Sequence, residues 1–485
     1  MPHRRLGPRR RRTAAGRGRP RAAVLSSLSA ATTGAGAPAA HVCVAGAGTR
    51  CPAVHAPARP GHRVRRAYSE SEGRAADRRT KAGAMRTGSN LPAVGEYNQT
   101  LVLDLIRRSP EGLSRVELSA RTGLSAQTLS NVTRRLADEG LIAEAGKVIS
   151  GPGKPRTLLK LEPRSRFAVG VHLDPVVDTI VVVDMAGEVI VHDEIPRTPH
   201  ASAAELVGAV AAAVDAIVAR AGIPRELVLG VGVAAPGPFD ARGGRLLDPP
   251  LLPQWHNVNV REDLGAATGL PVIVEKDVTA AMVGEMWFDR SDALTDAMFL
   301  YYGAGVGLGV AIAGAPVRGR TGNAGGIAHV VVDPDGPVCE CGSRGCLGVS
   351  IEPRVLLAEA GYDAAATGDT RPDLDRLVDD ARHGQSRAVG VLERAGERIA
   401  RALVVTNNLL DVDEVVLGGP VWERLAVVLG DTVAERVATD PVSTSTRAIA
   451  VRRSLVGLDV AAVGAACLML DGAFAARPAR MMIAL

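Results

Sequence analysis

Aromatic residues, cysteines and long apolar runs are scarce in this sequence. Phe, Trp and Tyr make up 3% of the 485 residues, although apolar residues make up 46%. The core is therefore expected to consist of aliphatic side chains. No run of 18 or more apolar residues occurs, which argues against a membrane-spanning helix and for a soluble protein. A chain of this length has room for two or three domains and a sizeable core.

Acidic residues are almost absent from the first part of the chain. Residues 1–84 contain 18 Lys and Arg against 3 Asp and Glu, a net charge of +15, whereas the rest of the chain carries a net charge of −10. The formal charge of +5 for the whole chain therefore averages two unlike parts. Residues 1–84 also lack hydrophobic periodicity, so they cannot bury enough apolar surface to offset the entropy lost on ordering.

Residues 1–84 have three interpretations. The segment is a disordered basic arm that binds nucleic acid, a secretion signal, or sequence upstream of a translation start at Met85. Residues 22–31 are mostly Ser and Ala, which is too weakly apolar for the hydrophobic region of a signal peptide. We therefore expect either a disordered arm or a start at Met85, because the sequence after Met85 is expected to make a complete protein by itself.

A helix-turn-helix pattern is expected within residues 95–163. Ser114 and Glu117 have the spacing of a capping box, which opens a helix. Gly123 then permits a tight turn, and Ser125 can cap the helix that follows. The order of cap, helix, turn and second cap is typical of DNA-binding modules in which the last of these helices contacts the bases.

That last helix combines an apolar stripe with a polar face. Leu129, Val132 and Leu136 recur at helical spacing and predict the buried stripe. The opposite face carries side chains that can reach base edges and phosphates, namely Gln127, Thr128, Ser130, Asn131, Arg134 and Arg135. Two short strand-like runs come next, and the basic residues on them are Lys147, Lys154 and Arg156. The pattern predicts a winged helix-turn-helix; the alternative is a three-helix bundle with a solvated polar face.

Strands and helices are mixed through the rest of the chain in two successive sets. The first set is expected over residues 164–285, with strand-like runs such as "FAVGVHLD" and "TIVVVD" and a helix at 203–220. The second is expected over residues 286–485, with the run "AMFLYYGAGVGLGVAIAG", a long helical region near 376–408 and a last helix at 460–470. This arrangement predicts two α/β domains with a cleft between them.

Three cysteines fall within eight residues, although the chain contains only six. Cys339, Cys341 and Cys346 have the spacing C-x-C-x4-C, with glycines that permit a tight loop. Close thiols in an intracellular protein indicate a metal site rather than disulfides. Zinc prefers four tetrahedral ligands, and His329, ten residues before Cys339, is the expected fourth. The alternative is a cluster of reduced thiols beside a histidine of the core.

The segment "GNAGGIAHVVVDPDGPVCECGSRGCLG" resembles the signature of the ROK family of repressors, open reading frames and kinases, roughly G-N-A-G-E-x-G-H and then C-x-C-G-x-x-G-C-L-E. The segments "AAPGPFD", "LPQWHNV", "PVIVEKDVTAA", "GAGVGLG" and "VVLGG" support the resemblance, which covers about residues 95–475. It implies an actin-like (RNase H-like) fold of two α/β domains behind the winged helix, and a sugar bound in the cleft. It also implies zinc held by His329, Cys339, Cys341 and Cys346, with His329 touching the sugar as well.

The phosphate loop of the family's kinases, D-x-G-G-T, is replaced here by "HLDPV", residues 172–176. Pro175 lacks an amide donor, Asp174 adds negative charge where a phosphate would approach, and Val176 lacks a hydroxyl group. Anion binding on backbone donors needs the opposite chemistry. The sequence therefore predicts no kinase activity, although glycine-rich loops such as "GAGVGLG" persist.

The resemblance also implies that Asp277 and His329 bind the ligand, and Lys276, which stands where the family has Asn, is expected to bind an anionic one. Asp277 matches the family's catalytic base; without a phosphate loop it is either a hydrogen-bond acceptor for a sugar or a cap of the helix that follows. Two glutamates and two asparagines of the family's pattern are missing. The residues at those positions are Gly326, Gly348, Lys276 and Leu251. We expect an altered ligand that is larger or anionic, very weak sugar binding, or no small-molecule ligand.

These observations predict a sequence-specific transcriptional regulator without enzymatic activity, and a cytoplasmic location is expected from its DNA-binding module. On the family resemblance it is a repressor that senses a sugar or sugar derivative. It is expected to bind an inverted-repeat operator in double-stranded DNA as a homodimer or homotetramer, and to hold one structural zinc ion per chain. The main alternative is a ligand-independent DNA-binding regulator with a degenerate sugar site, and an ATP-dependent sugar kinase comes third.

Overall fold

The computed structural model describes residues 91–148, 155–195, 201–290, 294–363 and 369–474. The interpretations of residues 1–84 and of Lys154 lie outside these ranges. The described residues all belong to one compact unit, Gly83–Leu485. None of the helices in these ranges combines the length and the apolar character that crossing a bilayer requires.

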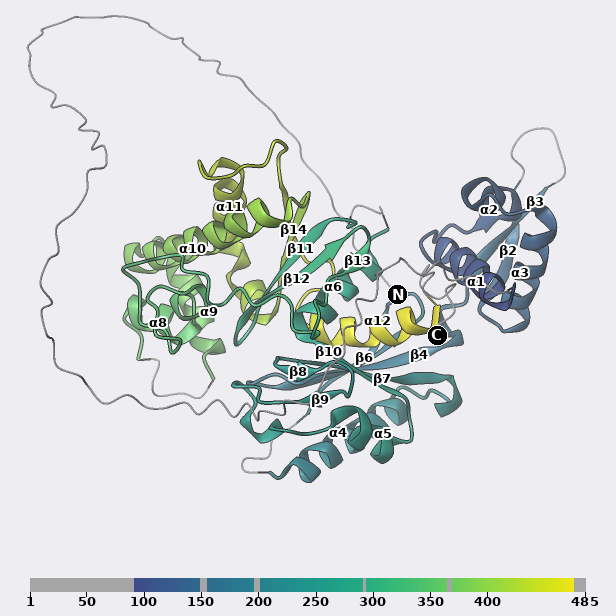
Figure 1. Ribbon diagram of the computed structural model, residues 1–485, viewed down its shortest axis with the longest axis horizontal. Coiled ribbons are helices and arrows are strands. Elements are labelled where there is room, and N and C mark those ends of the chain that lie inside the picture. Colours follow the sequence, from purple (N-terminus) through teal and green to yellow (C-terminus); the bar gives the residue numbers. More distant parts are fainter. Residues whose placement is uncertain (1–90, 149–154, 196–200, 291–293, 364–368, 475–485) are drawn as a thin grey trace, which may run out of the picture. The chain divides into compact units, whose positions relative to one another are not determined.

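The first part of the described chain is a winged helix-turn-helix (Figure 1). Its three-stranded antiparallel sheet has the order β1-β3-β2. The elements are α1 (Leu91–Arg107), β1 (Leu113–Ser114), α2 (Arg115–Thr122), α3 (Ala126–Asp138), β2 (Ile142–Val148) and β3 (Arg156–Leu161). This part of the fold confirms the sequence prediction.

Local signals in the sequence explain where these helices begin and end. The Ser114 side chain accepts a hydrogen bond from the Glu117 amide, and the Glu117 side chain accepts one from the Ser114 amide, so the predicted capping box is present. Gly123 ends α2 in the left-handed conformation, with φ of 70°. The Ser125 side chain accepts from the Thr128 amide and caps α3. All three predictions are confirmed.

The next lobe is built on a five-stranded sheet of order β10-β7-β4-β5-β6. β4, β7 and β10 run parallel, whereas β5 and β6 are antiparallel additions at one edge. Helices α4 and α5 contact each other, and their buried side chains share one core with alternate residues of β4 and β7. The elements are η1 (Pro163–Ser165), β4 (Phe167–His172), β5 (Asp178–Asp184), β6 (Val189–Ile195), α4 (Ala203–Arg220), η2 (Arg225–Leu227), β7 (Val228–Ala235), β8 (Phe239–Asp240), β9 (Arg245–Leu246), η3 (Pro253–Trp255), α5 (Val260–Thr268) and β10 (Val272–Lys276).

The last lobe repeats this plan with a sheet of order β13-β12-β11-β14-β15 and a group of helices beside it (Figure 1). Its elements are α6 (Asp277–Phe288), β11 (Ala297–Tyr302), β12 (Val306–Ile312), β13 (Ala315–Pro316), α7 (Leu347–Ser350), α8 (Pro353–Ala360), α9 (Arg371–Arg382), α10 (Ser386–Leu410), β14 (Glu414–Gly418), α11 (Pro420–Thr439), β15 (Ala450–Arg453) and α12 (Val460–Phe474). The single helical region predicted near 376–408 is two helices, because the chain turns at Gly384, with φ of 77°, between α9 and α10.

Helices α6 and α12 lie against each other between the two five-stranded sheets (Figure 1). α12 packs on β4 and β7, and α6 packs on β11 and β12. Glycines make this approach possible. A Cβ atom on Gly170 would lie 1.9 Å from the Ala462 carbonyl oxygen, and one on Gly464 would lie 1.9 Å from the Ala280 carbonyl oxygen. The inner core is therefore made of backbone and small side chains, which agrees with the low aromatic content.

Candidate functional sites

Helix α3 separates a buried stripe from an exposed polar face. Leu129, Val132 and Leu136 are buried as predicted, and Thr133 is buried beside them. The predicted polar face is exposed except for Thr128, which is half-buried beside the cap. Its exposed residues are Gln127, Ser130, Asn131, Arg134 and Arg135. The face therefore carries donors and acceptors suited to base edges and phosphates.

Hydrogen bonds within this face already orient two of its side chains. Arg134 Nη2 donates to Asn131 Oδ1 at 2.9 Å, and Gln127 Nε2 lies 3.5 Å from the same oxygen. A guanidinium group held in this way loses less side-chain entropy when it meets a base or a phosphate. Contact of these residues with DNA stays a prediction.

The wing is a hairpin with exposed basic residues on both strands. Lys147 on β2 pairs with Thr157 on β3, and Arg156 is the first residue of β3. Both basic side chains are exposed. In winged-helix proteins such a hairpin lies beside the recognition helix, so its cations are suited to phosphate contacts.

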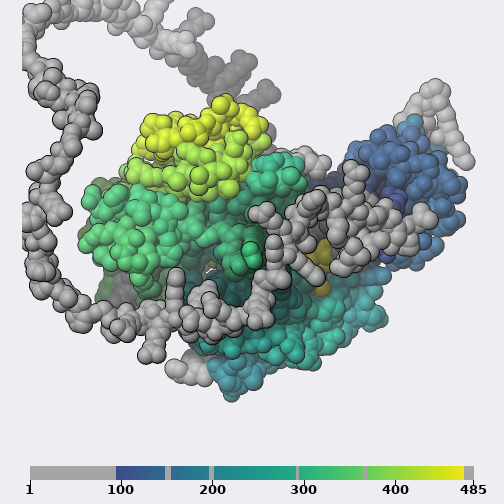
Figure 2. Space-filling view, viewed as in Figure 1, coloured from purple at the N-terminus to yellow at the C-terminus, as the bar shows by residue number. Residues whose placement is uncertain are grey.

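A cavity of about 140 Å³ opens where three parallel strands end. β4 ends at His172, β7 at Ala235 and β10 at Lys276. Residues at these ends line the cavity together with residues 305–307 of the second sheet and the loop at 325–326. The surface of the molecule is hollowed between the teal and green segments (Figure 2). Ligands of open α/β sheets bind at the carboxyl ends of the strands, so this cavity is in the expected place.

Asp277 is the first residue of α6 and lines this cavity. Its Oδ1 accepts a hydrogen bond from the Val278 amide at 2.7 Å, and the half-buried residue belongs to the cavity wall. Burial raises the pKa of the Asp277 carboxyl above its ordinary value, and the nearby His172 and Lys276 partly oppose this shift. α6 has no side-chain cap at its start, so the structure does not show the capping role that the sequence left open, and contact of Asp277 with a ligand stays a prediction.

Lys276 ties one loop of the cavity to the first sheet. Its Nζ donates to the carbonyl oxygens of Asn323 at 3.2 Å and of Ala324 at 2.9 Å. Burial lowers the pKa of the ammonium group. Since an ammonium has three donors, two are used inside the protein. The contacts assign Lys276 first to holding the loop, and its contact with a ligand stays a prediction.

The loop after β4 uses its own backbone donors. The Asp174 amide donates to Asp178 Oδ1 at 2.9 Å, and the Val176 amide donates to Asp174 Oδ1 at 2.8 Å. Pro175 between them has no amide hydrogen. The three consecutive residues 174–176 therefore offer no unused backbone N–H to an anion, and Asp174 is itself buried.

Sequence reasoning did not identify two features of the cleft. The His172 ring meets the Tyr301 ring edge to face, with 5.9 Å between centroids. A second cavity of about 220 Å³ shares His172 and Asp174 with the first, and its wall includes Arg371 and Arg424 from the last lobe. No sequence signal links these residues, because they come from elements that meet only in the folded chain.

The candidate metal site forms because two segments run side by side. The Leu347 amide donates to the Val330 carbonyl and the Gly348 amide to the Ala328 carbonyl, each at 2.8 Å, which places His329 beside Cys346. The cysteine loop is closed by a bond from the Cys339 amide to the Ser343 carbonyl at 2.8 Å. A Cβ atom on Gly345 would lie 1.4 Å from the Asp333 carbonyl oxygen, so only glycine fits this turn.

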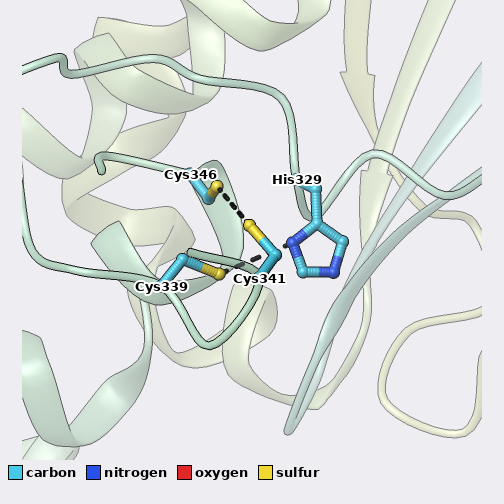
Figure 3. Close-up of side chains that lie close together, drawn as sticks. All are labelled: His329, Cys339, Cys341 and Cys346. Carbon is cyan, nitrogen blue, oxygen red and sulfur yellow. Dashed lines mark hydrogen bonds between the residues drawn. The ribbon is translucent and has the colours of Figure 1, made fainter. Parts of the chain in front are cut away.

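The four predicted ligands converge on one point (Figure 3). Their ligand atoms all lie within 4.8 Å of one another. Cys341 Sγ and Cys346 Sγ are 3.6 Å apart, and Cys339 Sγ is 3.5 Å from His329 Nδ1. Tetrahedral zinc, with Zn–S of about 2.3 Å and Zn–N of about 2.0 Å, separates its ligand atoms by roughly 3.5 to 3.8 Å. Hydrogen bonds from Ser343 lower the pKa of Cys341 to about 6, which favours the thiolate that a metal needs, whereas burial raises the pKa of the neighbouring Cys346 to about 12. The residues therefore fit a metal ion.

The two glycines that replace family glutamates lie in different surroundings. A Cβ atom on Gly326 would meet nothing within 4 Å, so the position opens into free space at the cavity. A Cβ atom on Gly348 would lie 3.1 Å from Ala328 Cβ, so the main chain is closely packed there. His329 is exposed and belongs to the metal-ligand group. It is not among the residues that line the cavity, the nearest of which in sequence is Gly326.

Comparisons with known proteins agree with this geometry. The model of the ROK family matches residues 177–472, and the model of the MarR family matches residues 96–146. The chain is 28% identical over 359 residues to the DNA-binding transcriptional dual regulator NagC of Escherichia coli strain K12, covering 72% of this chain and 86% of that protein. It is 31% identical over 217 residues to the glucokinase of Thermotoga maritima, covering 43% of this chain and 68% of that enzyme. The crystal structure of a ROK family transcriptional regulator, a homolog of the E. coli MLC protein, superimposes with a TM-score of 0.64 at 21% identity, covering 79% of this chain and 98% of that one.

Proposed function

Because this chain belongs to the ROK family, we propose that it is a sequence-specific DNA-binding transcriptional repressor whose α/β body binds a sugar or a sugar derivative. The observation that carries the proposal is the exposed polar face of α3, on a winged helix joined to a sugar-kinase-like body. A repressor of this kind works in the cytoplasm, where its operator is.

The first experiment measures DNA binding and its dependence on sugars. Fluorescence anisotropy would follow the protein on labelled DNA from the region upstream of its own gene, at several salt concentrations, with and without xylose, glucose, N-acetylglucosamine and their phosphates. We expect selective binding that weakens with salt and that one sugar changes. The absence of selective binding to this DNA and to a randomised DNA pool would contradict the proposal.

The repressor is further proposed to lack kinase activity. The closed backbone of residues 174–176 supports this, since the donors that would hold a phosphate are used or missing. A coupled assay for ADP release with ATP, Mg²⁺ and each sugar is expected to stay at the level of a sugar-free blank. Sugar-dependent ADP release would contradict this part of the proposal.

A ligand-independent regulator is the second candidate. It is favoured by Gly326, which leaves open space where a glutamate of the family's pattern would accept hydrogen bonds from a sugar. Calorimetric titration with neutral sugars, phosphosugars and aminosugars separates the two candidates. If Lys276 holds an anionic ligand, Lys276→Ala should weaken the binding of phosphosugars more than that of neutral sugars. An equal loss of affinity for both would indicate that Lys276 acts through the loop it holds.

We also propose that His329, Cys339, Cys341 and Cys346 hold one structural zinc ion per chain. The donor set and the spacing of the ligand atoms support this. Metal analysis of the purified protein is expected to give about one zinc per chain. Cys341→Ser is expected to lose zinc and to unfold at a lower temperature, whereas Cys467→Ser on α12, outside the ligand group, should keep the metal. Wild type without zinc would refute the assignment.

The operator is proposed to be an inverted repeat read by a homodimer or a homotetramer. Two recognition helices related by twofold symmetry contact half-sites spaced by about one helical turn of DNA or a multiple of it. Light scattering of the free protein and of its complex with selected DNA tests the stoichiometry. One chain bound per operator would exclude this arrangement.

A further inference from the structure

One helix extends from the ligand cavity to the winged helix. α6 begins at Asp277, which lines the cavity, and ends at Phe288. Its 12 residues span about 18 Å. The other end of α6 is covered by Arg107, the last residue of α1. The cavity of the proposed ligand and the proposed DNA-binding module therefore contact α6 at opposite ends.

The contact at the far end has the chemistry of a helix C-terminal cap. Arg107 Nη1 donates to the Trp287 carbonyl oxygen at 2.7 Å, and its guanidinium carbon lies 3.9 Å from the centre of the Trp287 ring. The last carbonyl groups of a helix have no partner within it, and the dipole favours a cation there. α6 has no basic residue in its own last turn. The winged helix supplies the missing cation.

Arg107 is held firmly on its own side of this contact. Its side chain is only 7% exposed and forms an ion pair with Asp104, one turn earlier on α1, at 2.8 Å. α1 also packs against α3, and buried residues of both helices belong to one core. A displacement of Arg107 therefore moves the recognition helix with it.

α6 is equally constrained within the body. A Cβ atom on Gly284 would lie 3.1 Å from Gly464 Cα, so α6 and α12 cross at close range. The buried Glu285 carboxylate accepts hydrogen bonds from the Leu455 amide at 2.9 Å and from Arg452 Nη1 at 3.0 Å. With so little free space around it, α6 responds to a change at one end as a rigid rod.

The covalent link gives the winged helix its second attachment. The linker at η1 is pinned to the turn after β5, since the Met185 amide donates to the Pro163 carbonyl oxygen at 3.0 Å. Ser165 Oγ contacts Met185 Sδ at 3.0 Å in the same place. α1 also packs on α12, so the winged helix meets the body at the linker, at α12 and, through Arg107, at the end of α6. A shift of α6 relative to the first sheet and α12 would therefore act on the winged helix through Arg107.

We propose that α6 transmits the state of the ligand cavity to the DNA-binding surface, and that Arg107 is the positioning residue that makes the connection. The inference rests on the proposed function, and it adds the route by which that function is regulated. Arg107 touches neither DNA nor ligand in this role; it acts through Trp287 and α1. The loss of Arg107 is therefore expected to weaken the coupling between the ligand cavity and the DNA-binding surface while both remain intact.

The test is a double-mutant cycle in the full chain, with the DNA that the wild type selects from a random pool. Asp277→Asn removes the charge at the cavity end of α6. We expect it to change the dissociation constant for DNA about fivefold or more in the wild-type background, the lower range of allosteric couplings. In the Arg107→Gln background the same change is expected to stay below about twofold, since the residues then no longer interact.

Two further variants separate coupling from simple loss of stability. Arg108→Gln removes a neighbouring cation from the same Asp104 carboxylate, 2.9 Å away, and leaves the contact with Trp287, so the effect of Asp277→Asn should persist. Arg107→Lys keeps a cation at the end of α6 and should restore part of the coupling. An equal effect of Asp277→Asn in the wild-type and Arg107→Gln backgrounds, or no effect in wild type, would overturn the proposal.

If the protein selects no DNA, the proposed function fails. A second measurement then still tests whether α6 is coupled to the winged helix. Hydrogen–deuterium exchange would follow peptides of α1 and α3 in four proteins: wild type, Asp277→Asn, Arg107→Gln and the double variant. We expect Asp277→Asn to change the exchange rate of α1 about twofold or more when Arg107 is present, and not when it is replaced. That result would support transmission. The same change in both backgrounds, or none, overturns it.

Discussion

The carboxyl group of Asp277 lies in surroundings that disfavour its charge. Burial raises its pKa, and the nearby His172 and Lys276 oppose this shift only in part. A carboxyl whose pKa is raised in the folded state stabilises the fold below its unfolded pKa. That contribution is lost as the pH rises through the folded pKa. This residue of the cavity wall thus lowers the stability of the fold at neutral pH.

We therefore expect Asp277→Asn to become more stable relative to the wild type as the pH rises from 4 to 7. The asparagine carries no charge at either pH, and its side-chain oxygen can still accept the bond from the Val278 amide. Urea unfolding of both proteins at the two pH values gives the difference in free energy. A difference that does not increase with pH would show that the Asp277 carboxyl is not held against ionisation.

Arg134 and Asn131 are the residues of α3 whose loss should weaken DNA binding most directly. Arg134→Ala is expected to cost about 1–3 kcal/mol of operator binding energy, because it removes a donor already oriented by Asn131. Fluorescence anisotropy measures the loss. Arg220→Ala, which removes an exposed arginine paired with Asp193 at the end of α4, should leave the affinity unchanged. Equal affinities of Arg134→Ala and wild type would exclude α3 as the recognition helix.

The residues of the candidate sites were predictable where their partners are close in sequence. The cysteines lie within eight positions, and the polar face of α3 follows from helical periodicity. The edge-to-face contact of His172 with Tyr301, and the bonds from Lys276 to Asn323 and Ala324, join distant segments. No local pattern encodes such pairs, because they depend on how the two sheets face each other.

At the level of elements, two of the helices expected from the sequence carry complete start signals of their own. α2 and α4 begin with complete capping boxes, at Ser114 and Ser202. By contrast, α8 and α11 have no side-chain cap, and neither was predicted. α10 begins without a side-chain cap as well, and it was merged with α9. Packing against the second sheet, rather than local sequence, determines these helices.

The cysteine loop is held in place by α10, a helix that begins at Ser386, 40 residues after Cys346. Arg398 on α10 is 9% exposed and donates to Asp333 Oδ2 at 2.8 Å and to the Ser350 carbonyl oxygen at 2.9 Å. Asp333 lies before the cysteines and Ser350 after them. The arginine therefore connects both ends of the loop to the body of the last lobe.

Arg398→Ala is expected to destabilise the protein by about 2 kcal/mol, because it leaves a partly buried carboxylate and a carbonyl oxygen without their donor. Thermal unfolding with zinc present measures the effect. The matched control is Arg394→Ala on the same helix, which removes an arginine that is 51% exposed and pairs with Glu359 at 3.1 Å. An exposed pair contributes less than about 1 kcal/mol. Equal losses for the two variants would contradict the anchoring role.

At the level of the whole molecule, α12 holds the two lobes together. Its residues from Val460 to Leu470 are all buried. Ending the chain at Asp459 removes the helix and uncovers the inner faces of β4 and β7, so this protein is expected to aggregate. Ending it at Phe474 keeps α12 and should give a folded protein. Size-exclusion chromatography and circular dichroism compare the two, and a folded chain ending at Asp459 that does not aggregate would contradict this account.

The place of α12 also fixes the order of events during synthesis. β4 and β7 leave the ribosome long before α12, yet their inner faces are covered by it. Chains grow at about 5–20 residues per second, so the sheet waits for its last helix on the order of tens of seconds. The nascent chain presents an apolar face to water for that time, and a chaperone that binds extended apolar strands would act in this interval.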